Sequence, residues 1–596
     1  MKNFSTIIES LAKSDYTHCA KMIFDNINCT HFESLMARKG LEKIYRNEKM
    51  SEKQKSDLIE LIGNKIPQHK DHIEKTYLFL QAFIPVGDII AHRIENSVTD
   101  NFPDSLTVFY YCMGRFVDET PDIIGTAKNV ILSIAKKCLK NDVSSINYQL
   151  SISLENIYSR SRPSLLLIYQ DAIKYGVLIE KYDAISFGSE LIESITIDQV
   201  PSMVLKLTNP EFEYGLQCGN KYDNLIAKKR YSEDDGYIES FYKCIICKYC
   251  RLTGVADSDK EVAMQMLKRQ FVNRNQTDLF FFLTGEYQSF VLSILTSIYT
   301  QFLTLFFCSS QTMKVITKSY IREKMLWGDV ISDEVFNDCY RLVVGDDVFK
   351  NTFIVVDEDI VVGRWQLDFD LNIVELAKRI SLNAKESRQA GKNANKFGKE
   401  IYEELVRSML GKTGWKVKPS SIKIKGENQT KTDIDLIAYN QGLVIIGQIK
   451  FANSGRTRYD IWKAKQTINK AVAQINLSMS KFSEDPNLLY SILKKDGFVA
   501  NKEDIKKVIP VVITSSSYFI GEYGVTHIPV VSWDIFSQII ESTNYFDTVM
   551  NIDGYFSDVV SLYDFGFPKK IVISKIESEE FDIQYEEYDC EDESWD

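Results

Sequence analysis

The chain has 596 residues, of which 44% are hydrophobic and 26% charged, and its formal net charge at pH 7 is −11. This composition excludes a collagen-like, a wholly disordered and a small disulfide-stapled protein, and the length predicts two to four domains. Eleven cysteines without paired spacing, and no apolar signal segment after Met1, predict a reducing, cytoplasmic location.

The first 350 residues carry helical patterns. Apolar residues recur at spacings of three and four in five segments, which predicts amphipathic helices. These segments are 4–11, 55–62, 76–83, 127–139 and 164–175. We therefore expect residues 1–350 to form a mainly helical sensor or assembly region, which would bind a second copy of the chain or a partner protein.

The longest uncharged run, residues 287–313, exceeds the roughly 20 residues that a membrane span needs. Polar side chains such as Ser289, Ser293 and Thr296 recur along one helical face of this run. A helix that faces lipid has no use for such a stripe, whereas a helix buried among others does. We expect no membrane insertion.

Four cysteines in the same region have spacings that also occur in metal sites, namely Cys218, Cys244, Cys247 and Cys250. The last three lie within an apolar helical stripe, and steps of three residues rotate by about 60° each along a regular helix. The outer two then could not share one ion. A buried helix is the simpler interpretation, and a metal site is the alternative.

Residues 351–396 are expected to form a hairpin and a linker. Two apolar runs, 353–356 and 360–362, flank an acidic stretch and predict the hairpin. Residues 381–396 are polar with scattered alanine, which predicts a solvated helix or a linker.

An amphipathic helix is predicted directly after this linker. Its apolar stripe consists of Tyr402, Leu405, Val406, Met409 and Leu410. Glu403 flanks the stripe, and Gly411 is expected to end the helix.

Residues 432–451 contain two runs rich in β-branched residues on either side of Asn-Gln-Gly, which predicts a β-hairpin. If Tyr439 and Leu443 close a three-residue loop, Asp435 lies opposite Gly447, with about one residue of uncertainty in register. The Asp435 carboxylate then lies beside Gln448.

Side chains alternate along a strand, so Gln448 and Lys450 share one face and Ile449 points to the other. Asp435, Gln448 and Lys450 are therefore expected to converge. Hard oxygen ligands suit Mg²⁺, and a neighbouring cation can orient a water for attack on a phosphodiester. An ordinary edge hairpin with solvated polar residues is the alternative.

Together, this helix and hairpin resemble the PD-(D/E)xK nuclease superfamily, and among its branches most closely the Mrr-type restriction endonucleases. The resemblance implies a multidomain chain, with an α/β restriction-endonuclease-like domain over residues 397–545 after the mainly α-helical region. It also implies that Asp435 is the central metal ligand, that Gln448 is a second ligand through its oxygen, and that Lys450 lies next to the attacking water. Glu403 would contribute to the metal or water shell.

The sequence departs from the family pattern at two positions. Ile434 stands where the family name has proline, and Gln448 replaces an acid, which removes one negative charge from the expected metal site. Asp433, two residues before Asp435 on the same strand face, could compensate or could be the ligand itself.

Charge is unevenly distributed. Residues 378–431 contain fourteen Lys or Arg and five acids, a local charge of +9. Phosphate contacts supply most non-specific affinity for nucleic acid, so this region is a candidate binding surface, with a solvated basic face as the alternative. The candidate binding residues are Lys399, Lys416, Lys418, Lys431, Arg456 and Arg458.

A C-terminal extension, residues 546–574, leads to an acidic tail over 575–596 with eleven acids and one lysine. We expect this tail to be unstructured by itself. It could compete with nucleic acid for the basic region, bind a basic partner, or be a plain flexible terminus.

These features predict a Mg²⁺-dependent phosphodiesterase in which Mn²⁺ can substitute, and the resemblance implies that it is an endodeoxyribonuclease. By the resemblance, its substrate is double-stranded DNA, in prokaryotic restriction or anti-phage defence. Two alternatives stay open: a nuclease-fold binding module with weak or no catalysis, and a nuclease that cleaves RNA.

Overall fold

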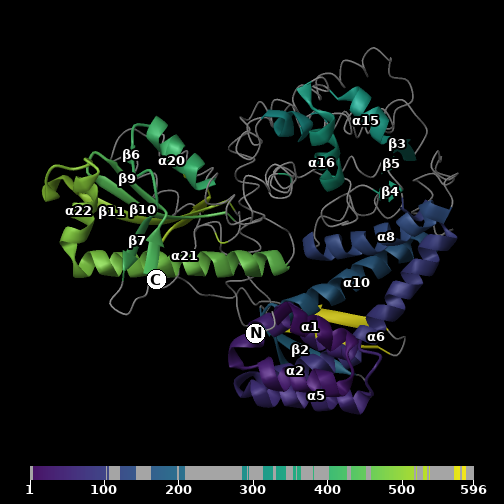
Figure 1. Cartoon of the computed structure of the whole chain (residues 1–596). Coiled ribbons are helices and arrows are strands. Elements are labelled where there is room, and N and C mark those ends of the chain that lie inside the picture. The colour runs from purple at the N-terminus through teal and green to yellow at the C-terminus, as the bar shows by residue number, and fades with distance from the viewer. Residues whose placement is uncertain are drawn as a thin grey trace, which may run out of the picture. The chain divides into compact units, whose positions relative to one another are not determined.

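The structure is a computed structural model that describes about half of the chain (Figure 1). The described residues are 4–102, 104–106, 121–141, 163–188, 190–196, 201–207, 285–291, 293, 313–325, 330–343, 354–356, 359–363, 380, 402–425, 431–451, 458–515, 519, 528–532, 536, 570–576 and 580–585. Cys218, Cys244, Cys247 and Cys250 lie outside these residues, as do the linker at 381–396 and most of the run at 287–313. Among the described residues, no helix is both long and apolar enough to cross a membrane.

The chain divides into two compact units, and each is described by itself. Unit 1 comprises Met1–Glu213, Thr457–Tyr459 and Phe565–Asp596, and unit 2 comprises Tyr214–Arg456 and Asp460–Asp564. Helices form most of the described N-terminal region, and mixed sheets occur in the C-terminal part.

The five helices expected in the N-terminal region are confirmed. Unit 1 contains α1 (Phe4–Lys13), α2 (Tyr16–Asn26), α3 (Phe32–Ala37), α4 (Gly40–Tyr45), α5 (Glu52–Lys65), α6 (Lys70–Asp100), α8 (Pro121–Asn141) and α10 (Pro163–Ser186). Short 3₁₀ turns, Cys29–His31 and Pro67–His69, connect some of these helices. Each expected segment lies inside a helix because its apolar stripe packs into a core, as Ile7, Ile8 and Leu11 of α1 do.

Unit 1 also contains a four-stranded antiparallel sheet that the helical patterns did not predict. Its strands are β1 (Glu190–Thr196), β2 (Ser202–Leu207), β13 (Lys570–Lys575) and β14 (Phe581–Tyr585), in the order β1-β2-β13-β14. The C-terminal strands, yellow in Figure 1, thus complete a sheet that begins in the N-terminal region.

The start of the acidic tail, which we expect to be unstructured by itself, is held as β14 by pairing with β13. Phe581 is buried in the sheet, and the carboxylate of Glu580 lies 2.6 Å from Lys174 Nζ and 3.3 Å from Arg93 Nη1. These two cations lower the pKa of Glu580, with the hydrogen bond from Lys174 as the largest cause. Ladder pairing and buried apolar surface hold the start of the tail in place, despite its acidic composition.

In unit 2, a small sheet contains the hairpin expected at 353–362. Its strands β4 (Ile354–Val356) and β5 (Asp359–Gly363) are joined by β3 (Met313–Ile316), in the order β3-β5-β4. Two helices follow β3 in the chain, α15 (Lys318–Lys324) and α16 (Asp333–Val343).

A larger, mixed five-stranded sheet in unit 2 has the order β12-β11-β10-β9-β6. Strands β10, β11 and β12 are parallel, and β9 and β6 continue the sheet antiparallel. The elements are α20 (Glu403–Lys412), β6 (Lys416–Val417), β7 (Ile422–Lys425), β8 (Lys431–Ile434), β9 (Leu436–Asn440), β10 (Leu443–Lys450), α21 (Arg458–Glu484), α22 (Pro486–Lys495), a 3₁₀ turn at Lys502–Asp504, β11 (Lys507–Thr514) and β12 (Val530–Ser532). Strands β7 and β8 pair separately as a two-stranded sheet.

Helices cover both faces of the five-stranded sheet. Val406 and Leu410 of α20 belong to the same apolar cluster as Ile445 and Ile449 of β10. On the other face, β10 packs against α22 and the C-terminal part of α21, which runs along the sheet in Figure 1. Every side chain of β10 up to Ile449 is buried, so a polar residue in this strand needs a polar partner.

Candidate active site

The hairpin is present, but its loop has two residues, not the three that were expected. Asn440 pairs with Leu443, and Gln441 and Gly442 form the turn with φ angles of 47° and 97°. Two positive φ angles in succession are characteristic of the type I′ turn, which matches the twist of antiparallel strands. The register therefore differs by one residue from the predicted one, and Asp435 lies level with Gln448.

Asp435 lies at the point where the chain leaves one sheet and enters another. The preceding strand β8 pairs with β7, and the following strand β9 pairs with β10. The Asp435 N–H donates to the Gly447 carbonyl at 3.2 Å, and Oδ2 accepts from the Ile449 N–H at 3.2 Å. The carboxylate is 4% exposed, so backbone contacts fix its direction.

Three of the four predicted catalytic side chains, those of Asp435, Gln448 and Lys450, are in contact. Lys450 Nζ donates to Asp435 Oδ2 at 2.9 Å and to Gln448 Oε1 at 2.6 Å. Gln448 is fully buried, and its Nε2 donates to the backbone carbonyl of Asp433. The ammonium group of Lys450 thus lies between a carboxylate and an amide oxygen.

The side chain of Asp433 points elsewhere. Its Oδ1 accepts a hydrogen bond of 2.5 Å from Gln474 Nε2 of α21. Asp433 therefore contacts Gln448 through its backbone carbonyl and contacts α21 through its carboxylate. Gln474 was not predicted, because no local pattern relates it to a strand about 40 residues earlier.

Glu403, the fourth predicted residue, is connected to Asp435 through an arginine, Arg407. Its Oε2 accepts from Arg407 Nη2 at 2.7 Å, and Arg407 also donates to the Asp435 carbonyl from Nη2 at 2.8 Å and from Nε at 3.2 Å. Arg407 was not predicted, although its position four residues after an acid on one helix is a recognisable signal. Gly411 was expected to end this helix, but the helix continues to Lys412. Gly414 follows it with a φ of 88°.

The oxygen atoms present fit a small divalent cation. The Asp435 carboxylate and Gln448 Oε1 both face one positive group, and Mg²⁺ binds such oxygens while it retains several waters. Among the described residues, no three His, Cys, Asp or Glu side chains are arranged to hold a metal.

The predicted nucleic-acid-binding residues lie in different surroundings. Lys416 Nζ donates to the Phe498 carbonyl at 3.2 Å, and Lys418 forms an ion pair of 2.5 Å with Asp496. The side chain of Lys431 and all of Lys399 and Arg456 lie outside the described residues.

Arg458 does not fit a nucleic-acid contact. It is 3% exposed and forms a hydrogen-bonded ion pair with Glu180 within unit 1, where Lys181 lies 3.3 Å from the same carboxylate group. These cations lower the pKa of Glu180 against the opposing effect of its burial, which is the largest single influence. A buried, paired guanidinium has no phosphate to contact.

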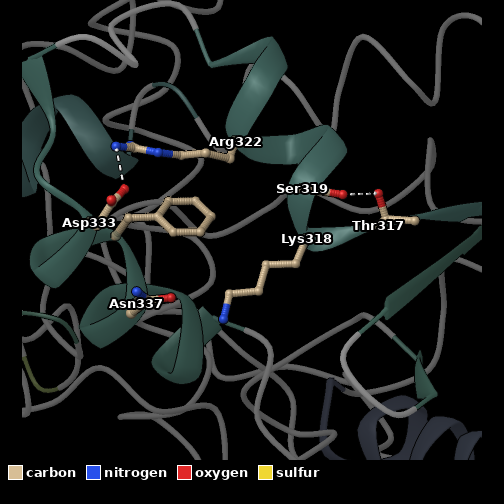
Figure 2. Close-up of a pocket in the computed structure, with 7 residues that line it drawn as sticks. Thr317, Lys318, Ser319, Arg322, Asp333 and Asn337 are labelled. Atoms are coloured by element: carbon tan, nitrogen blue, oxygen red, sulfur yellow. Dashed lines mark hydrogen bonds and ion pairs between the residues drawn. The ribbon is translucent and has the colours of Figure 1, made fainter.

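A pocket with a volume of about 400 Å³ lies between α15 and α16, away from these residues in the chain (Figure 2). Its lining residues are Thr317, Lys318, Ser319, Arg322, Asp333, Phe336 and Asn337. The guanidinium of Arg322 donates to Asp333 at 3.1 Å and lies over the Phe336 ring, while Lys318 Nζ lies 5.2 Å from the centre of the Tyr340 ring. This lining includes neither a histidine nor a cysteine, and its one carboxylate is paired.

Comparison of the chain with protein-family models, with curated proteins and with solved structures gave no match.

Proposed function

We propose that the chain is a metal-dependent nuclease whose active site is formed by Asp435, Gln448 and Lys450. The observation that carries this proposal is the contact of one ammonium group with a carboxylate and an amide oxygen at the end of β10. Lys450 is half-buried at the end of a strand whose other side chains are buried, and its two hydrogen-bonding partners, Asp435 and Gln448, lie on the same hairpin. The resemblance to Mrr-type enzymes of the PD-(D/E)xK superfamily supports the same assignment.

In this proposal, Asp435 and Gln448 would hold Mg²⁺, with Mn²⁺ as a substitute. A bound divalent ion supplies charge stabilisation to the phosphoryl group and lowers the pKa of a coordinated water. Lys450 orients the attacking water and stabilises negative charge that develops on the phosphate. The fixed backbone contacts of Asp435 hold its carboxylate in one direction before substrate binds.

The proposed substrate is double-stranded DNA, and the proposed setting is restriction or anti-phage defence in a prokaryotic cytoplasm. This part rests on the resemblance. The helical N-terminal region would then act as the sensor or assembly part, which binds a second copy or a defence partner.

The test is incubation of the full-length protein with plasmid, linear duplex, single-stranded DNA and RNA, each with Mg²⁺, Mn²⁺ or EDTA. We expect cleavage of duplex DNA that EDTA abolishes and that Asp435→Asn reduces by at least about 100-fold, since it removes the carboxylate that this proposal assigns to the metal. Cleavage that persists in Asp435→Asn refutes the site, and preferential cleavage of RNA refutes the substrate.

One observation favours a second candidate, a nuclease-fold binding module without catalysis. Because Gln448 is neutral and Lys450 lies between the two oxygen ligands, the site carries less negative charge than a pair of acids would provide. The same experiment separates the two candidates, because a binding module would retain nucleic acid in a mobility-shift assay but produce no cleaved product with either metal.

A further inference from the structure

Arg407 is a buried cation that connects the helix α20 with the proposed metal ligand. It is 8% exposed, and its guanidinium group contacts the Glu403 carboxylate at 2.7 Å on one side. On the other side, two of its nitrogens donate to the backbone carbonyl of Asp435, at 2.8 and 3.2 Å. One side chain thus joins the helical acid to the peptide of the metal ligand.

These contacts reach Asp435 from the side opposite to its carboxylate. Val406 and Leu410, which flank Arg407 on α20, pack against the face of β10 that carries Ile445 and Ile449. Gln448 and Lys450 alternate with those residues and share the other face of the strand with Ile446. The Asp435 carboxylate contacts Lys450, while its carbonyl contacts Arg407.

The position of Asp435 explains why such a contact is needed. Where the chain passes from β8 to β9, Oδ2 of Asp435 takes the Ile449 N–H as a partner. A buried carbonyl at that point requires a donor, and two N–H groups of one planar guanidinium fix its orientation better than one bond would. The carbonyl and the side chain belong to one residue, so a fixed peptide also fixes the position of the Cα atom from which the carboxylate side chain extends.

We propose that Arg407 is a positioning residue for Asp435, and that Glu403 holds Arg407 rather than serving as a metal ligand. This inference rests on the proposed function, and it replaces the role in the metal or water shell that the family resemblance implies for Glu403. Both side chains are buried, so each neutralises the charge of the other. Together they form a brace behind the metal ligand.

The brace leads to a quantitative expectation. Without the guanidinium, the Asp435 carbonyl loses two donors and the peptide can rotate. A displacement of about 1 Å in a catalytic group can lower the rate by roughly 100-fold, and loss of a residue that orients a ligand lowers metal affinity by about 10- to 100-fold. Arg407→Met should therefore lower kcat about 100-fold and weaken Mn²⁺ binding about 10-fold.

The experiment uses full-length Arg407→Met, Arg407→Lys, Glu403→Gln and the double variant Glu403→Gln/Arg407→Met. Lys470→Met is the matched control, since it removes an exposed cation from α21, outside the basic stretch at residues 378–431. Three properties are measured: kcat and KM for DNA cleavage, the Mn²⁺ dissociation constant by electron paramagnetic resonance, and the thermal unfolding temperature. Arg407→Lys keeps the charge but not the planar pair of donors, so we expect it to recover part of kcat, with KM unchanged.

The double variant decides the role of Glu403. In a brace, loss of either partner disables the other, so the double variant should bind Mn²⁺ no more weakly than Arg407→Met alone. Were Glu403 a ligand, its replacement would weaken Mn²⁺ binding further, by an independent factor, and the inference would be overturned.

Failure of the inference and failure of the proposed function give different results. If Asp435-dependent cleavage is present but folded Arg407→Met retains the kcat and Mn²⁺ affinity of the wild type, the brace is refuted and the nuclease assignment stands. If no substrate is cleaved, yet Mn²⁺ binding depends on Asp435 and weakens in Arg407→Met, the brace is supported without the nuclease. Should Arg407→Met fail to fold, Arg407→Lys decides by the same two measurements.

Discussion

Replacement of Lys450 by methionine should expose the competition between the ammonium group and a metal ion. Lys450 Nζ lies 2.9 Å from the Asp435 carboxylate and 2.6 Å from Gln448 Oε1. Methionine has a similar length and no charge. Lys450→Met therefore leaves the buried carboxylate with the Ile449 N–H as its remaining described donor.

The size of the effect follows from burial. Removal of one partner from a fully buried ion pair costs about 3–5 kcal/mol, because the other charge stays desolvated. The Lys450 side chain is 20% exposed and the Ile449 N–H remains, so water and one backbone dipole compensate in part. We expect a loss of about 2–3 kcal/mol in local stability when EDTA is present.

Mg²⁺ should then stabilise the variant more than it stabilises the wild type. A ligand at ten times its dissociation constant adds about 1.4 kcal/mol to the folded state, and in the wild type the ion must compete with an ammonium group for the same oxygens. Saturating Mg²⁺ should therefore recover at least half of the stability that Lys450→Met loses, although cleavage stays absent.

The assay is amide hydrogen exchange of peptides that cover β9 and β10, in EDTA and in saturating Mg²⁺, because it reports the local opening free energy of this hairpin. Lys470→Met, at an exposed position on α21, is the control for loss of a positive charge. Asp435→Asn is the control for loss of the metal ligand. The reasoning is refuted if Mg²⁺ protects β10 equally in Asp435→Asn and in the wild type, or if Lys450→Met exchanges no faster than Lys470→Met in EDTA.

Three further predictions concern other parts of the chain. Gln448→Glu removes the donor to the Asp433 carbonyl, so the free energy of unfolding, measured in urea, should fall by about 1–3 kcal/mol. The added charge should lower the Mg²⁺ concentration needed for half-maximal cleavage, and unchanged stability would contradict the amide contact. Burial lowers the pKa of His72 from 6.5 to about 4, so between these pH values the unfolded state binds more protons than the folded state. The free energy of unfolding should therefore fall as the pH drops from 6.5 to 4, and in urea titrations His72→Gln should make it depend less on pH. Truncation after Tyr585 removes seven acids and keeps β14, so the thermal unfolding temperature should not change. If the acidic end competes with nucleic acid, this truncation should also tighten nucleic-acid binding at low salt. Truncation after Lys575 deletes β14 and should lower the thermal unfolding temperature by several degrees.

The local elements of this protein could be predicted from its sequence. The five N-terminal helices, the hairpin at residues 353–362 and the hairpin that carries Asp435 and Lys450 all follow from periodicity over about ten residues. Such patterns predict local structure because each element buries one face, and the spacing of its apolar side chains shows which face is buried. The convergence of Asp435 with Gln448 and Lys450 followed in the same way, since all three belong to one hairpin.

Finer local geometry was not predictable. The loop was expected to have three residues, but the turn at Gln441 and Gly442 has two, because successive positive φ angles let Asn440 pair with Leu443. A glycine marks where a turn lies but does not fix how many residues the ladder leaves unpaired. The role of Glu403 could not be predicted either. Helical spacing places Glu403 beside the apolar stripe of its helix, but it does not show which cation pairs with the carboxylate.

Only the tertiary structure decided which distant segments meet. Strands β13 and β14 complete a sheet that begins about 380 residues earlier with β1. The acidic composition there predicts disorder, but ladder pairing and the cations beside Glu580 outweigh it. Arg458 looked like a phosphate contact in a basic stretch, but it is buried against Glu180. A charged side chain can be buried only where another part of the chain supplies its partner, and that partner is set by the packing of the whole unit rather than by neighbours in sequence.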